Sequence, residues 1–536
     1  MNNLEWWKTC IIYQIYPRSF MDSNNDGIGD LKGIENKLDY LKKIGVDAIW
    51  ISPFYPSPMH DFGYDISDYK GIHQIFGTMN DFEDLLSKSH KLGIKLIIDF
   101  VPNHTSDEHP WFVESRKSKN NPFRDFYIWR DPAPDGGPPN NWLSYFGGSA
   151  WEYDDQTKQY YLHQFVKQQP DLNYQNSKVL EEMLSVLDFW LAKGVDGIRV
   201  DVICNMWKNP EFPNEKLNRR WNGKFPYERF ERKYSSNTRE VHDIIRRFRE
   251  VLNRYSDRVM IGETYLPFRE LIKYYGKNGD ECHLPFNFHL LTTPWKASAV
   301  REVVDHFEDM LPNGCCPSYV LGNHDRQRLV TKVKSEEQSR VALFMLLTLR
   351  GTPTVYYGEE IGMKNVKIPL NMIQDPPALN MPEIADDVGR DPVRTPMQWS
   401  ASSNAGFSAK GVKTWLPIDD DYKKINAEIL FADSASILNM FSKLVKLRKK
   451  YQALNSGDYV SLKSISKNIY AYLRTYGTER FLIVLNFSKK SSMINFEEIL
   501  NLSRGEILLS ANMLESGMVD LSSLIVEGDN GFLIKL

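Results

Sequence analysis

The 536-residue chain is poor in the features that mark several large protein classes. It has only five cysteines, widely spaced and without a CxxC pair, so neither a disulfide framework nor a zinc site is expected. The absence of a GxGxxG or Walker sequence argues against an open doubly wound sheet with a phosphate-binding turn. The charges nearly cancel, with 66 Lys+Arg against 69 Asp+Glu, so no nucleic-acid partner is expected.

Long apolar runs are also missing. Val341 to Leu349, one of the longest uncharged apolar-rich stretches, has nine residues, about half of what a membrane span needs. The stretch Met1 to Thr9 carries charges and no apolar core, so we expect no signal peptide. These features predict a cytoplasmic protein with reduced cysteines and no membrane partner, either a monomer or a weak homo-oligomer.

What the chain does contain is an alternation of short β-rich runs with helical patterns. The helical patterns cover Leu31–Ile44, Asp81–Leu92, Val179–Ala192, Arg239–Arg254, Val300–Met310 and Gln338–Leu349. The expected strands are Ile11–Tyr16, Ala48–Ile51, Lys95–Phe100, Gly197–Val202, Met260–Glu263, His283–Phe286, Ser318–Leu321 and Thr354–Tyr357. Eight strands interleaved with helices predict the α/β class and a (β/α)₈ barrel.

Two segments interrupt this rhythm. Residues 103–173 are rich in Pro, Gly, Asn and aromatics and are too long for a plain loop, so we expect a small inserted domain after the third strand. A second excursion, 362–404, follows the eighth strand. Residues 1–102 and 174–456 then form the barrel, and 457–536, with short strands and polar turns, is expected to be a C-terminal β-sandwich.

Three acidic residues stand at or just beyond the ends of expected strands: Asp201, Glu263 and Asp325. In a barrel they would share the C-terminal face, where active sites lie. Clustered carboxylates without metal ligands suit glycosyl transfer, in which one carboxylate attacks the anomeric carbon and a second serves as acid and base. We expect Arg199 to lower the pKa of Asp201, and a less polar pocket to keep Glu263 protonated.

Several motifs together resemble glycoside hydrolase family 13, the α-amylase family, in its α-glucosidase and oligo-1,6-glucosidase branch. The resemblance covers nearly the whole chain. It rests on the segments Asp99–His104, Gln169–Asn173, Gly197–Asp201, Gly262–Thr264, Gly322–Asp325, Gly351–Glu360 and Arg390–Trp399.

The resemblance implies a retaining, exo-acting α-glucosidase that needs no cofactor for catalysis. Asp201 would be the nucleophile, Glu263 the acid/base, and Asp325 the residue that grips the sugar hydroxyls. Asp61 and Arg394 would clamp the 4-hydroxyl of a terminal glucose. The substrate-binding set would be Asp61, Tyr64, His104, Phe146, Phe165, Arg199, Val202, His324 and Arg394.

The loop Asp22 to Asp30 carries oxygen ligands at alternate positions and resembles half of an EF-hand, without the bidentate Glu at position twelve. It resembles the metal loop of the same branch. A structural Ca²⁺ or Mg²⁺ would be held by Asp22, Asn24, Asp26 and Asp30, with the Ile28 carbonyl.

The linkage preference is the open question. In this branch Val after the nucleophile is associated with α-1,6 activity, and Val202 occupies that position. Arg326-Gln327 and Tyr174 depart from the oligo-1,6-glucosidase pattern and keep maltose and sucrose as alternative substrates. The other hypotheses are a glucosyltransferase or sucrose isomerase on the same scaffold, a transporter-accessory chain, and a metal-dependent barrel hydrolase.

Overall fold

The computed structural model describes residues 5–463 and 465–536. Residues 1–4, part of the stretch predicted to carry no signal peptide, lie outside the described residues. Seven parallel strands form one sheet in the order β10-β1-β2-β3-β7-β8-β9. Their bounds are β1 Ile12–Ile15, β2 Ala48–Ile51, β3 Lys95–Phe100, β7 Gly197–Val200, β8 Val259–Gly262, β9 Leu284–Pro285 and β10 Thr354–Tyr356.

The seventh predicted strand, Ser318–Leu321, is a pair of isolated parallel bridges. Tyr319 pairs with Asn287 just beyond β9, and Val320 pairs with Thr354 at the start of β10. This segment therefore connects the two edges of the sheet. The predicted (β/α)₈ class is confirmed, with strands that are mostly shorter than predicted.

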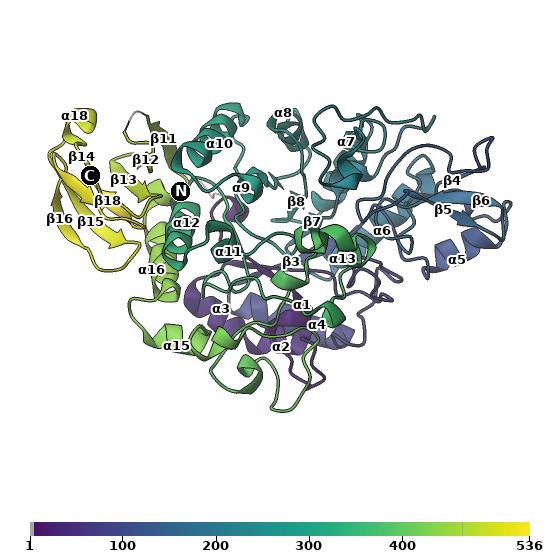
Figure 1. Ribbon diagram of the computed structural model, residues 1–536, viewed down its shortest axis with the longest axis horizontal. Coiled ribbons are helices and arrows are strands. Elements are labelled where there is room, and N and C mark those ends of the chain that lie inside the picture. Colours follow the sequence, from purple (N-terminus) through teal and green to yellow (C-terminus); the bar gives the residue numbers. More distant parts are fainter. Residues whose placement is uncertain (1–4, 464) are drawn as a thin grey trace.

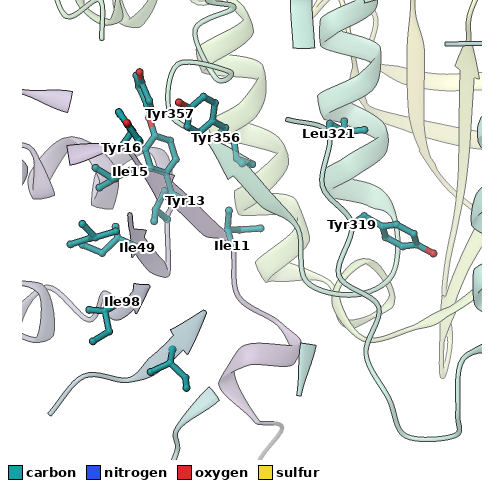
Figure 2. Close-up of a cluster of buried hydrophobic side chains, with 14 of the residues drawn as sticks. Ile11, Tyr13, Ile15, Tyr16, Ile49, Ile98, Tyr319, Leu321, Tyr356 and Tyr357 are labelled. Carbon is teal, nitrogen blue, oxygen red and sulfur yellow. The ribbon is translucent and has the colours of Figure 1, made fainter. Parts of the chain in front are cut away.

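The strands bury both of their faces, which explains their nearly continuous apolar sequence. Alternate residues enter different cores: Ile12, Trp50 and Ile97 belong to the cluster inside the barrel, and Tyr13 and Ile49 to the cluster under the helices. Figure 2 shows part of the second cluster, with Tyr13, Ile15, Ile49 and Ile98 close together.

Helices cover the barrel strands. The principal ones are α2 Leu31–Asn36, α3 Leu38–Ile44, α4 Met79–Lys91, α6 Ser177–Ala192, α7 Val241–Leu252, α10 Ala297–Met310, α12 Glu336–Thr348 and α16 Ile437–Lys450. The shorter ones are α1 Pro17–Phe20, α8 Phe268–Leu271, α9 His289–Thr292, α11 Leu329–Val333, α13 Pro376–Asn380, α14 Ala385–Val388, α15 Ala427–Ala432 and α17 Gln452–Asn455.

Local sequence sets several helix ends. Thr78 and Asp81 form a capping box that starts α4, and Gly45 ends α3 in the left-handed conformation. The single helix predicted over Leu31–Ile44 is wrong, because Lys37 leaves helical geometry (φ −104°, ψ 3°) and divides it into α2 and α3.

The inserted segment 103–173 contains α5 Pro110–Lys117 and a three-stranded antiparallel sheet of β4 Trp129–Arg130, β5 Trp151–Asp154 and β6 Gln159–Leu162. Figure 1 shows this blue sheet at one end of the molecule, the yellow C-terminal sheet at the other, and the barrel between them.

In the C-terminal region, six antiparallel strands form one sheet: β11 Asp458–Leu462, β12 Ile469–Tyr476, β13 Glu479–Asn486, β15 Arg504–Ser510, β16 Gly517–Asp520 and β18 Gly531–Lys535. A separate pair consists of β14 Ser492–Ile494 and β17 Leu524–Val526, with α18 Glu497–Leu500 nearby in sequence. Among the helices of residues 5–463 and 465–536, none combines the length and apolar character needed to cross a bilayer.

Candidate active site

The centre of the site is the Arg199 side chain, which is fully buried on β7. One guanidinium nitrogen lies 2.7 Å from Asp99 and 2.7 Å from Asp201, and the other lies 2.8 Å from Glu263. Asp99 faces Arg199 directly in the register of β3 and β7. Three carboxylates from three neighbouring strands therefore converge on a single positive charge.

Asp201 directly follows the last residue of β7, and Glu263 directly follows the last residue of β8. The Asp201 amide still donates to the Phe100 carbonyl (2.8 Å) and the Glu263 amide to the Val200 carbonyl (3.1 Å), so both positions extend the parallel ladder. Both side chains are largely buried, and both contact the same guanidinium. The two acids are therefore neighbours at the C-terminal face of the barrel.

Val202, next to Asp201, has a strained backbone. Its φ of 35° and ψ of 46° lie in the left-handed region, which β-branched residues rarely adopt. This conformation ends the predicted strand Gly197–Val202 early, and it turns the Val202 amide towards Glu263, to whose Oε2 it donates at 2.8 Å. Glu263 Oε2 thus has two polar partners, whereas the sequence predicted a less polar pocket.

The charge balance of this cluster is negative, because one guanidinium faces three carboxylates. Burial raises the pKa of Asp201 well above its ordinary value; Arg199 opposes this effect, whereas Glu263 and Asp99 add to it. Burial likewise raises the pKa of Asp99 to about 6. Arg199 thus lowers the pKa of Asp201 as predicted, but burial and the two neighbouring carboxylates outweigh it, so the free site tends to retain a proton.

Asp325 has the opposite electrostatic setting. Burial acts to raise its pKa, but His324 and the guanidiniums of Arg390 and Arg394 outweigh that effect and hold the pKa well below its ordinary value. Asp325 lies 2.9 Å from Arg394 and 3.1 Å from the His324 ring. Asp325 is thus a stable carboxylate beside a cluster that shares a proton.

Tyr64 links these two groups of acids. Its hydroxyl lies 2.8 Å from His324 Nε2 and 3.2 Å from Asp99, and its ring stacks on His324 at 5.5 Å. Burial lowers the pKa values of His104 and His324 to about 3, so both rings are neutral at physiological pH. Both imidazoles can therefore act as neutral hydrogen-bonding groups towards a sugar.

Asp61 pairs with Arg390 (2.7 Å), and Arg394 turns instead to Asp325. In the free site Asp61 therefore pairs with Arg390, and the binding of a sugar 4-hydroxyl by Asp61 and Arg394 stays a prediction. Asp375, which is fully buried, holds Arg390 through the side chain (2.7 Å) and the backbone amide (2.7 Å). Arg390 thus reaches Asp61 from a fixed position, with its guanidinium 4.7 Å from the Phe146 ring centroid.

The aromatic side chains predicted to bind sugar lie together. Phe165 is 5.2 Å from the His104 ring and 5.4 Å from the Phe146 ring. Gln169, from the segment that closes the inserted domain, lies 3.1 Å from both Asp61 and His104. The inserted segment therefore supplies one wall of the site and the barrel supplies its base.

A buried lysine supports His104 from behind. Lys208 pairs with Asp171 at 2.7 Å and donates to Asn103 Oδ1 at 2.9 Å. Since an ammonium is donor-only, this contact orients the Asn103 amide so that its nitrogen faces His104 Nδ1, at 3.1 Å. Sequence patterns gave no signal for this role of Lys208.

The family described as "Alpha amylase, catalytic domain" matches residues 14–457. This chain belongs to the alpha-amylase family. Within it, the chain is 42% identical over 539 residues to an oligo-1,6-glucosidase of Parageobacillus thermoglucosidasius, with 94% of each chain covered. It is 40% identical to an alpha-glucosidase of Apis mellifera, with 92% of this chain and 87% of the relative covered.

Among solved structures of the family, an isomaltulose synthase mutant from Erwinia rhapontici NX5 in complex with sucrose has a TM-score of 0.91 and 36% identity, with both chains fully covered. The chain is therefore a member of the alpha-glucosidase and oligo-1,6-glucosidase branch. The similar proteins include an oligo-1,6-glucosidase, an alpha-glucosidase and an isomaltulose synthase, so membership in the branch does not by itself define the linkage.

The alpha-amylase family resemblance had also implied a metal loop. Its carboxylates are occupied by donors within the loop: Asp22 accepts from the Asn25 and Gly27 amides, and Asp26 from the Ile28 amide and Asn24. Asp30 accepts from Ser23 and the Gly33 amide. The oxygen-only donor set suits Ca²⁺ in kind. Among the described residues, however, no three His, Cys, Asp or Glu side chains are gathered to hold an ion.

The principal residue that sequence reasoning missed is Arg390. It lies in the same Arg390–Trp399 motif as Arg394, and the i, i+4 spacing gives no basis for choosing between them. The deciding partner is Asp375, which is fifteen residues away in an irregular segment and carries no sequence signal. Asp99 is the first residue of the motif Asp99–His104. The side-chain alternation of the two neighbouring strands, which places Asp99 and Arg199 on the same face, could have identified it.

Proposed function

We propose that this protein is a retaining exo-α-glucosidase that releases terminal glucose from short oligosaccharides, with a preference for α-1,6 linkages. The observation that supports it best is the shared guanidinium of Arg199, which holds Asp201 and Glu263 side by side. Retention needs two carboxyl groups about 5–5.5 Å apart on either side of the anomeric carbon. A pair bound by one guanidinium suits that spacing.

In the proposed first step, an Asp201 oxygen attacks C1 while the bond from C1 to the glycosidic oxygen breaks. Glu263, acting as the general acid, gives a proton to the leaving oxygen. Water then loses a proton to Glu263 and attacks C1, which frees Asp201 and releases α-glucose. Asp325, held ionised, accepts hydrogen bonds from the sugar hydroxyls.

The exo action is proposed from the Asp61–Arg390 pair. A carboxylate and a guanidinium 2.7 Å apart offer an acceptor and donors to the 4-hydroxyl of a terminal glucose. A further sugar attached at that hydroxyl would displace one of the two partners. Tyr64, Phe146 and Phe165 supply apolar faces for the sugar rings.

The linkage preference is tested with isomaltose and maltose. We expect a higher kcat/KM for isomaltose. We expect Val202→Thr to shift the ratio towards maltose by roughly 5- to 160-fold, because one side chain in such a subsite discriminates by about 1–3 kcal/mol. Thr is β-branched like Val, so the left-handed backbone of residue 202 is strained to a similar degree in both proteins. Val202→Ile, which is also β-branched but stays apolar, is the control.

A wild-type preference for maltose of tenfold or more would overturn the α-1,6 assignment. The alternative is then an α-1,4 maltase or sucrase, or a glucosyltransferase or sucrose isomerase on this scaffold. Product analysis separates these: hydrolysis yields free glucose, whereas transfer yields new glucosides or an isomer of sucrose.

A structural Ca²⁺ or Mg²⁺ in the loop Asp22–Asp30 remains a proposal. To bind an ion, the loop carboxylate oxygens would have to coordinate it while they also accept hydrogen bonds from backbone N–H groups. We expect Ca²⁺ at a hundredfold excess over its Kd to stabilise the fold by about 2.7 kcal/mol, seen as a higher Tm than in chelator. Asp26→Asn should abolish the increment, and Asp39→Asn, which removes an exposed carboxylate on α3, should keep it. Equal Tm values for the wild type in calcium and in chelator would contradict the proposal.

We also propose a cytoplasmic location and a monomeric or weakly associated state. In the described chain all five cysteines are free, which suits a reducing compartment. The expected partner is a small oligosaccharide or disaccharide.

A further inference from the structure

A ring of tyrosines and arginines lies immediately beyond the three acids. We call it the outer rim and define it as Tyr145, Tyr227, Arg232, Tyr265 and Arg326. Arg326 directly follows Asp325, and Tyr265 is two residues beyond Glu263. The Arg326 guanidinium lies 5.1 Å from the Tyr265 ring centroid, and that of Arg232 lies 3.6 Å from the Tyr145 ring centroid.

The rim is continuous with the site. Tyr145 stacks on Phe165 at 5.2 Å and lies 6.4 Å from Tyr227, ring to ring. Burial raises the pKa of Tyr227, and both Arg326 and Arg232 act against it, so the two guanidiniums face the same phenol. Asp325 also acts on Arg326. In the proposed function Asp61 and Arg390 bind the 4-hydroxyl end of the terminal glucose. The outer rim lies beside Glu263 and Asp325 instead, so it is placed to contact the leaving group.

The arginines of the outer rim lack the carboxylate partners that the arginines deeper in the site have. Arg199, Arg390 and Arg394 each contact carboxylates. Within residues 5–463 and 465–536, neither Arg232 nor Arg326 has a carboxylate within 4.0 Å; Arg232 donates only to the Tyr227 carbonyl at 3.2 Å, and Arg326 is exposed. The rim loop 216–233 adds to this excess, with seven Lys or Arg against two Glu.

Two guanidiniums without a carboxylate partner, set beside tyrosine rings, can bind an anionic group attached to a sugar. The planar fork of arginine matches the oxygens of a phosphate, and aromatic faces pack against sugar rings. A neutral leaving sugar would use the rings and leave both charges without a partner. A phosphate on that sugar would use both.

We propose that the outer rim binds a phosphorylated sugar as the leaving group, so that the substrate is an α-glucoside of a sugar phosphate. The inference rests on the proposed glucosidase function. Water adds across the glycosidic bond, and the products are glucose and the sugar phosphate, with the phosphate ester untouched.

The test compares maltose with maltose phosphorylated at C6 of the reducing glucose, and trehalose with trehalose 6-phosphate. We expect the wild type to have a higher kcat/KM for the phosphorylated member of at least one pair, mainly through a lower KM. Arg326→Gln and Arg232→Gln should each lower the ratio of phosphorylated to neutral substrate by about fivefold or more, because each removes a charge-assisted contact. Higher salt should lower the wild-type ratio as well.

The matched control is Arg480→Gln, which removes an exposed arginine from β13 in the C-terminal sheet and should leave the ratio unchanged. Activity of the wild type on p-nitrophenyl α-glucoside reports the proposed function separately. If that activity is present and neutral substrates are preferred in both pairs, or if neither rim variant changes the ratio, the phosphosugar proposal is wrong and the glucosidase proposal stands. If the aryl glucoside is not cleaved, the glucosidase proposal itself fails.

Discussion

Replacing Asp201 with Asn is expected to lower kcat/KM for a terminal α-glucoside by about 10⁴-fold or more, because no other carboxylate is positioned to replace the nucleophile. Asn has nearly the same shape, and Arg199 still pairs with Asp99 and Glu263. The protein should therefore fold, and the loss should be a loss of chemistry. Steady-state kinetics with p-nitrophenyl α-glucoside measure it.

Rescue by a small anion assigns the two acids separately. In Asp201→Ala, azide can enter the vacated space and attack C1 from the same face, giving β-glucosyl azide. In Glu263→Ala, azide should instead attack the covalent intermediate from the opposite face, giving α-glucosyl azide. Nuclear magnetic resonance of the products distinguishes the two anomers. Substantial turnover by Asp201→Asn without added anion, or rescue of both variants with the same anomer, would remove the assignment.

The barrel was predictable because its strands carry a strong signal. Both faces of β2 and β3 are buried, so Ala48–Ile51 and Lys95–Phe100 read as apolar runs that match the observed bounds. The acids were predictable for a related reason: a polar residue after such a run marks the C-terminal face. Ser318–Leu321 has the same apolar pattern but pairs with its neighbours at only two positions. An apolar pattern predicts that a segment is buried in the sheet, not how many backbone hydrogen bonds it forms there.

What the sequence could not supply depends on tertiary contacts. The left-handed backbone of Val202 contradicts the propensity of a β-branched residue and is held by the neighbouring Glu263. The pKa of Asp201 is raised by its burial and by the other carboxylates that share Arg199, and strand alternation alone reports neither. The pairing of Asp61 with Arg390 in place of Arg394 depends on Asp375, which lies in an irregular segment without a sequence signal. Each of these features concerns the proposed active site, where local preference and final geometry commonly diverge.

Replacing Arg448 with Met is expected to destabilise the protein by on the order of 5 kcal/mol. Arg448, on α16, is fully buried, and among the described residues it has no carboxylate partner. Its guanidinium donates instead to the carbonyls of Leu347, Leu349, Leu454 and Gly351, at the C-terminal ends of α12 and α17. Methionine would leave the carbonyls of Leu347, Leu349 and Gly351 without this donor, at about 1–3 kcal/mol each. The Leu454 carbonyl keeps a hydrogen bond from Arg474.

The charge on Arg448 persists despite its burial, which lowers its pKa only to about 10. Arg474, from β12, uses the same arrangement: it donates to Thr348 at 2.6 Å and to Leu454 at 3.1 Å, so two domains meet at one set of helix ends. The cost should appear as a lower urea midpoint and Tm. Lys446→Met, on the exposed face of the same helix, is the matched control and should shift stability by less than about 0.5 kcal/mol. Equal unfolding midpoints for the two variants would show that these carbonyls find other donors, and that the arginine pair does not hold the C-terminal sheet to the barrel.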